Sequence, residues 1–240
     1  MKNHWTQPYS SDYVQFGLKE FHVISNERLG DIEYCVIPGK NKKTDVPIVM
    51  VQGMGLGIQS WSLDFLKTLD DFTLYLIDPI ESFEMANYAE SVYEVTKQLS
   101  TFFFVGYSFG SFVIQQYMSF FPTKPIQKIV FVAGGDLCAF KLYDLKKTGL
   151  LHKKQNNDLI LRQGIATIKA RISKENCFLQ ESESSDIPIL LIRAENDNIF
   201  LQDYLFCGKN EITVKHVNHN LLETRPVFVA NTISTYLLQT

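Results

Sequence analysis

One ten-residue run limits the possible folds of this chain more than any other stretch: Phe102-Phe103-Phe104-Val105-Gly106-Tyr107-Ser108-Phe109-Gly110-Ser111. Its first part is short and wholly apolar, which predicts a strand buried on both faces, as in the centre of a parallel sheet. Beyond Ser108, side chains recur at helical spacing until Pro122 and predict a helix; they are Phe112, Val113, Gln116, Tyr117 and Phe120. Ser108 is therefore expected at the turn between a buried strand and a helix.

Ser108 is the centre of a G-x-S-x-G pattern, whose glycines are Gly106 and Gly110. So tight a turn places the serine in a strained backbone conformation, and we expect a side chain at either glycine to collide with the neighbouring strand or helix. The N–H groups and the dipole at the start of the helix would face an oxyanion formed beside the hydroxyl. The pattern thus presents Ser108 as a candidate nucleophile.

Strand, turn and helix around Ser108 resemble the nucleophile elbow of the α/β-hydrolase superfamily, and the resemblance extends from about Ile32 to the C-terminus. It implies the fold class α/β, with a mostly parallel central sheet, helices on both faces and a small helical lid. It also implies a serine hydrolase that cleaves a carboxylic ester or a thioester through an acyl-enzyme.

The remaining apolar patterns predict the rest of such a sheet. An antiparallel hairpin is expected over 21–25 and 31–37, with buried strands over 47–51 and 126–133 and further strands over 73–77, 187–192 and 212–217. Helices are expected at 61–69, about 89–99 and about 226–238. The strand pattern breaks off between Asp136 and Asp186, where the resemblance places the lid. Residues 1–135 and 187–240 are thus expected to form a single core, with 136–186 inserted.

Length and composition agree with one domain and exclude several classes of partner. A chain of 240 residues suits a single α/β domain. Its net charge of −3 gives no reason to expect nucleic acid, and no apolar run is long enough for a membrane span. The segment Met1–Asp12 lacks the apolar core of a signal peptide, which favours a cytoplasmic location. No cofactor is expected. No metal is expected either, because the four cysteines lie far apart without metal-ligand spacing; they are Cys35, Cys138, Cys177 and Cys207.

The resemblance supplies two partners for Ser108. Asp197 ends Arg193-Ala194-Glu195-Asn196-Asp197, which resembles the strand end that carries the acid of the superfamily's triad, with Ala194 in place of glycine. His219 lies in a segment that resembles the loop of the catalytic histidine, with Asn218 in place of a frequent glycine. The order Ser108, Asp197, His219 is that of the superfamily. His219 would take the serine proton, and Asp197 would hold the imidazole and stabilise its charge.

Asp136 is the alternative acid, because some lipases and thioesterases of the superfamily use the end of the corresponding strand. The other histidines are expected at the surface or in packing roles, with His216 at the end of the last strand; the rest are His4, His22 and His152.

The loop Gln52-Gly53-Met54-Gly55-Leu56-Gly57 resembles the one that completes the oxyanion hole. Gln52 stands where the superfamily usually has histidine. The backbone N–H groups of Met54 and Phe109 would hold the oxyanion.

Three hypotheses remain for the substrate. Apolar side chains at the elbow and in the expected lid suggest an apolar acyl pocket and a small-molecule ester; they are Met54, Leu56, Phe109, Phe140, Leu142, Leu150 and Leu151. The span 141–174 has nine Lys and Arg against two Asp, so the lid either meets an acyl carrier protein or a CoA-linked substrate, or is a solvated helical face. In the third hypothesis, the fold serves as a non-catalytic binding or scaffold protein.

Overall fold

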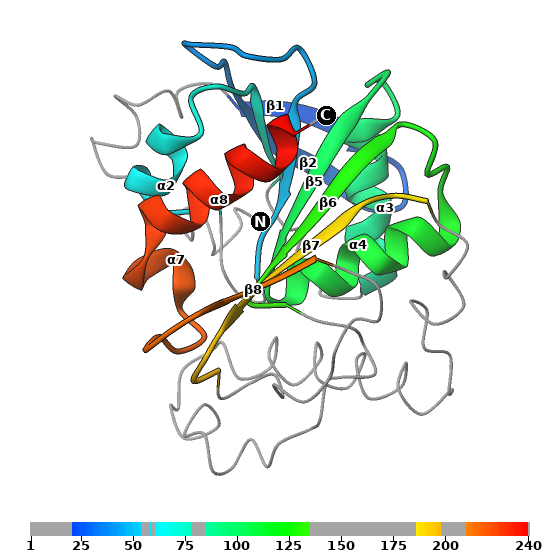
Figure 1. The fold of residues 1–240 in the computed structure, drawn as a ribbon. Helices are drawn as coiled ribbons and strands as arrows, with labels where there is room; N and C mark the ends of the chain where they lie inside the picture. Colours follow the sequence, from blue (N-terminus) through cyan, green and yellow to red (C-terminus); the bar gives the residue numbers. More distant parts are fainter. Residues whose placement is uncertain are drawn as a thin grey trace, which may run out of the picture.

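The computed structural model describes residues 21–53, 58, 61–77, 85–134, 186–197 and 210–239. They form an eight-stranded sheet with the order β1-β2-β4-β3-β5-β6-β7-β8 (Figure 1). Strand β2 is antiparallel to both β1 and β4, and every other neighbouring pair is parallel. The strands are β1 (Phe21–Asn26), β2 (Gly30–Ile37), β3 (Ile48–Val51), β4 (Leu74–Ile77), β5 (Phe102–Tyr107), β6 (Ile126–Val132), β7 (Ile189–Ala194) and β8 (Asn210–Val214).

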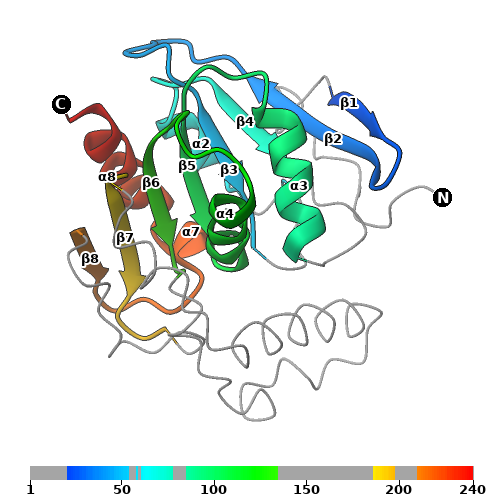
Figure 2. The ribbon, with the colours of Figure 1, turned by 90° about the vertical axis from the view of Figure 1, so that its right-hand side faces the viewer.

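Helices cover both faces of the sheet, which confirms the predicted α/β class (Figure 2). On one face lie α3 (Met85–Thr96) and α4 (Phe109–Phe120), which pack against each other. On the other face α2 (Leu63–Thr68) packs against α8 (Pro226–Leu238), and the single turn α7 (Leu221–Thr224) precedes α8. Within the described ranges, no helix is long and apolar enough to cross a bilayer.

The central strands are apolar because each of their faces lies against a layer of helices. All six residues of β5 are buried, as predicted. Along β3, Ile48 and Met50 join the core under α2 and α8, whereas Val49 and Val51 join the core under α3 and α4. This alternation follows from the two-residue period of a strand.

The order of the strands creates a switch point between β3 and β5. From β3 the chain runs outward to β4 on one side, and it then returns to β5 on the other side. In open α/β sheets, ligands bind beyond the carboxyl ends of the strands at such a point. The elbow after β5 therefore lies where this fold forms its sites.

The last strand and its flanking turn differ from the prediction. The strand ends at Val214 rather than at residue 217, and His216 lies in a turn with a positive φ of 58°. Val217 beyond this turn is buried, so the apolar pattern runs on although the strand has stopped. His216 was therefore wrongly expected within the strand.

Phe120 was also wrongly expected on the apolar face of its helix, because it is 62% exposed. It is the last residue of α4, where the helix leaves the sheet, and the following Phe121 packs on the core in its place. The proposed lid, 136–186, lies outside the described residues except for its last position.

Candidate active site

Ser108 lies between β5 and α4 in a backbone conformation that residues other than glycine rarely adopt. Its φ is 51° and its ψ is −115°. The Ser108 N–H donates to the Val132 carbonyl at 2.9 Å, and the Ser108 carbonyl accepts from the N–H and the hydroxyl of Ser111 at 3.0 and 2.7 Å. These bonds on both sides of the residue hold the strained turn that was predicted.

The two glycines of the elbow are required by close approach. A Cβ at Gly110 would lie 2.7 Å from the Val51 carbonyl carbon, in the backbone of β3. At Gly106 it would lie 2.7 Å from the end of the Ile114 side chain and 3.0 Å from the Gly110 backbone. The expected collisions with strand and helix are therefore present.

The structure brings Ser108, His219 and Asp197 into one hydrogen-bonded chain. The Nε2 atom of His219 lies 2.8 Å from the Ser108 Oγ. The Nδ1 atom lies 2.9 and 3.1 Å from the two carboxylate oxygens of Asp197. Because an ionised carboxylate only accepts, Nδ1 carries the proton in this arrangement, and Nε2 is left to accept from the serine hydroxyl.

Backbone hydrogen bonds between the loops after β7 and β8 bring the acid and the base together. The N–H of Glu195 donates to Val214 and that of Asn196 to Val217, both at 2.9 Å. The Glu195 carboxylate accepts from the His216 N–H at 2.8 Å. His216 thus helps to connect the loops, and its own side chain is largely exposed.

Asn218 does not require the conformational freedom of the glycine it replaces. Non-glycine residues with positive φ in the described ranges are Ser108, Ala133 and His216. The Asn218 Oδ1 accepts from the Asn220 N–H at 3.1 Å, which is a side-chain turn typical of asparagine. The loop can therefore present His219 without a glycine.

The site is largely removed from solvent. The side chains of His219 and Asp197 are 10% and 5% exposed, whereas Ser108 is partly exposed. The Nε atom of Arg193, in β7, lies 3.4 Å from the Oε1 atom of Glu211. Burial lowers the pKa of Arg193, while Glu211 and Asp197 oppose that effect. A buried positive charge therefore lies near the acid of the hydrogen-bonded chain.

The remaining predicted residues are only partly described. Phe109 is the first residue of α4, so its N–H has no partner within the helix. Met54 and the alternative acid Asp136 lie outside the described residues. Gln52 is fully buried, and neither polar atom of its side chain has a hydrogen-bond partner within the described ranges.

Sequence reasoning missed Tyr107. Its hydroxyl and its ring both contact His219, across 112 positions of the chain. The one available signal was a hydroxyl on the last residue of an otherwise apolar strand, directly before the serine.

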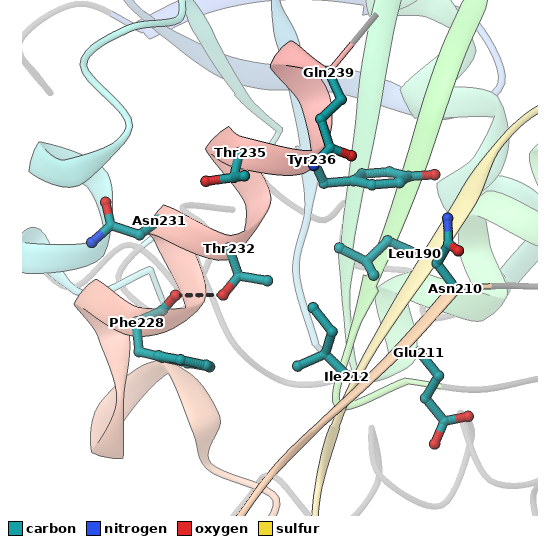
Figure 3. Close-up of a pocket in the computed structure, with 10 residues that line it drawn as sticks. All are labelled: Leu190, Asn210, Glu211, Ile212, Phe228, Asn231, Thr232, Thr235, Tyr236 and Gln239. Carbon is teal, nitrogen blue, oxygen red and sulfur yellow. Dashed lines mark hydrogen bonds between the residues drawn. The ribbon is translucent and has the colours of Figure 1, made fainter.

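A groove of about 590 Å³ lies elsewhere, between β8 and α8 (Figure 3). It is lined by Leu190, Asn210, Glu211, Ile212, Phe228, Asn231, Thr232, Thr235, Tyr236 and Gln239. None of the three hydrogen-bonded residues is among them. In the part of the chain that the structure describes, no three His, Cys, Asp or Glu side chains could jointly hold a metal ion.

Topology and elbow together define the α/β-hydrolase fold, and solved structures with that fold match nearly the whole chain. A bromoperoxidase from Bacillus anthracis has a TM-score of 0.67 at 17% identity, over 92% of this chain and 100% of its own. For the carboxylesterase CesB from Bacillus subtilis the TM-score is 0.65 at 19% identity, over 95% of each chain. The esterase RhEst1 from Rhodococcus sp. ECU1013 has a TM-score of 0.63 at 17% identity, over 90% of this chain and 98% of its own. No family profile and no curated protein matches the sequence.

Proposed function

We propose that this protein is a serine hydrolase that cleaves a carboxylic ester or thioester through an acyl-enzyme. The observation that carries the proposal is the hydrogen-bonded chain from the Ser108 hydroxyl through His219 to Asp197. A serine hydroxyl is a weak nucleophile at neutral pH and needs a base in contact with it. The fold is also that of esterases and a carboxylesterase, so it accommodates this reaction.

In the proposed reaction, the Ser108 Oγ bonds to the acyl carbon while its proton passes to the His219 Nε2. The tetrahedral intermediate collapses as the same proton moves to the leaving alcohol or thiol, and the acyl group stays on Ser108. Water then attacks the acyl-enzyme, with His219 again taking a proton and returning it to Ser108. Asp197 keeps the imidazole oriented and stabilises its transient positive charge.

The proposed oxyanion hole uses the backbone N–H of Phe109 together with that of Met54. Phe109 starts α4, so the positive end of the helix dipole adds to its donor. Loss of one such donor in enzymes of this kind lowers the rate roughly a hundred- to a thousandfold.

The test of the proposal is covalent labelling. A fluorophosphonate probe should label the wild-type protein on one residue, and Ser108→Ala should abolish the label. Ser119→Ala is the matched control, since its hydroxyl lies further along α4, where it donates to the Gln115 carbonyl, and its removal should leave the label on Ser108. A folded wild-type protein without any adduct would contradict the proposal and favour a non-catalytic binding or scaffold protein.

For the substrate, an apolar acyl group fits the apolar residues at the elbow, and a small-molecule carboxylic ester is the simplest choice. The basic span 141–174 favours a second candidate, an acyl chain carried by an acyl carrier protein or CoA. Turnover of a carrier-bound substrate should then fall steeply with salt, while a short p-nitrophenyl ester shows little dependence. Equal salt dependence of the two substrates would remove the carrier from consideration.

A further inference from the structure

Tyr107, the last residue of β5, contacts His219 in two ways. Its hydroxyl donates a hydrogen bond of 3.3 Å to the His219 backbone carbonyl. Its ring stacks on the imidazole, with centroids 6.0 Å apart and an angle of 25° between the planes. We propose that Tyr107 is a positioning residue, whose hydroxyl holds the backbone of His219 in place while its ring packs on the imidazole. The inference rests on the proposed function, because His219 acts there as the base.

The hydroxyl contact restrains the peptide that leads from His219 into α7. The same carbonyl also accepts a hydrogen bond from the Leu221 N–H at 2.9 Å. The carbonyl oxygen has two lone pairs, so it can accept from Tyr107 and Leu221 at once. Burial raises the pKa of Tyr107, and the charges of Glu223 and Asp197 add to this effect. The hydroxyl therefore stays protonated and remains a donor at neutral pH.

The ring contact is held in place by the core behind it. Trp61, which is fully buried, packs against Tyr107 with ring centroids 6.1 Å apart and the ring planes tilted by 57°. Tyr107 itself is only 5% exposed, so its ring cannot turn away from His219 without opening this core. When His219 takes the serine proton, its positive charge forms beside an aromatic ring, which attracts cations at about this distance.

Strand geometry explains why this residue can serve the site. Phe103, Val105 and Tyr107 alternate along β5 toward the core that also contains Leu221 and Leu222 of α7. Ser108 follows at once, in the turn. One strand end therefore places the nucleophile and, through Tyr107, the loop of its base.

The test replaces Tyr107 by Phe, which keeps the ring and removes the hydroxyl. The matched control is Tyr117→Phe, because Tyr117 is also buried with a hydroxyl in one hydrogen bond, to Thr96 at 3.0 Å, but it lies in the core on the other face of the sheet. Hydrolysis of p-nitrophenyl butyrate is measured for both variants. We expect Tyr107→Phe to lower kcat about fivefold, which corresponds to the net contribution of one hydrogen bond. The KM should stay within about twofold of wild type. Tyr117→Phe should leave kcat unchanged.

A second measurement does not depend on turnover. The Nδ1 proton of His219, which is donated to the Asp197 carboxylate, should give a low-field signal in the proton NMR spectrum of the wild-type protein. That signal should broaden or exchange faster in Tyr107→Phe and stay unchanged in Tyr117→Phe. An unaltered signal and unaltered kcat in Tyr107→Phe, or equal losses in both variants, would overturn the positioning role. A wild-type protein without fluorophosphonate labelling would contradict the proposed function, and the NMR comparison would still decide the role of Tyr107.

Discussion

Asp197 is the residue on which the proposed chemistry most depends after Ser108 and His219. Its two oxygens lie within 3.1 Å of the His219 Nδ1, and its side chain is 5% exposed. A carboxylate in this place selects the tautomer in which Nε2 can accept the serine proton. The geometry favours Asp197 as the partner of the imidazole, whereas the rival Asp136 lies outside the described residues.

Replacing the acid should distinguish the two candidates. Asp197→Asn keeps the size of the side chain but favours the wrong imidazole tautomer, so kcat should fall by about 10³ to 10⁴. Asp136→Asn should cost less than about tenfold, because Asp197 already accepts from the His219 Nδ1 and selects the tautomer. Both rates are measured with the same p-nitrophenyl ester on protein whose folding is checked by circular dichroism. A larger loss at Asp136 would move the acid to the end of β6.

At the level of helices and strands, the elbow is shaped by how closely α4 approaches β3. Gly110 lies against the backbone of Val51 and Gln52, and a Cβ on this glycine would lie 3.0 Å from the Gln52 carbonyl oxygen. This approach carries α4 across β3 and β5 and aligns the start of the helix with Ser108. Side chains at this crossing would separate the helix from the sheet.

The two elbow glycines should therefore differ in their tolerance of alanine. In Gly110→Ala the new methyl group collides with the backbone of Val51 and Gln52, which cannot move aside as a side chain can. We therefore expect the free energy of unfolding to fall by about 4 kcal/mol, or the variant to fail to fold. Gly106→Ala first meets the flexible end of Ile114 and should cost less, about 2 kcal/mol. Unfolding in urea measures both. Adding Ile114→Val to Gly106→Ala should restore part of the loss, and no recovery would contradict the assigned contact.

Over the molecule as a whole, parallel strands place distant parts of the sequence at one edge of the sheet. Strands β5, β7 and β8 point the same way, so their carboxyl ends meet on one side. Ser108 and His219 thereby come into contact across 111 positions of the chain. The same packing buries Tyr236 of α8 against the sheet, beside β8.

Stability should fall in strong alkali because of this buried tyrosine. Burial raises the pKa of Tyr236 from 10.0 to about 12, with the nearby side chain of Asn210 acting in the opposite direction. The folded protein thus holds this proton more tightly than the unfolded chain, and the resulting stability is present below about pH 10 and is lost as the pH rises to about 12. Urea unfolding between about pH 9 and about pH 11.5 should show a shallower decline for Tyr236→Phe than for wild type. Parallel declines would contradict the assignment.

Local patterns along the chain were enough to predict several parts of the fold. The hairpin, the buried strand of the elbow, the helix Pro226–Leu238 and the strained serine all follow from apolar periodicity and from two glycines around one residue. The resemblance also named Ser108, Asp197 and His219 in advance, although it could not supply the distances between them.

The places where these patterns stop, and the residues that meet across the chain, depend on tertiary packing. The last strand ends at Val214 because Glu195, from another loop, accepts a hydrogen bond from the His216 N–H and holds the turn. The residues around His216 do not predict this contact. Phe120 is exposed because of where α4 leaves the sheet. The contact of Tyr107 with His219 depends on the packing of β5 against the loop before α7. Periodicity reports which face of an element is apolar, whereas partners distant in sequence are set by how those faces pack.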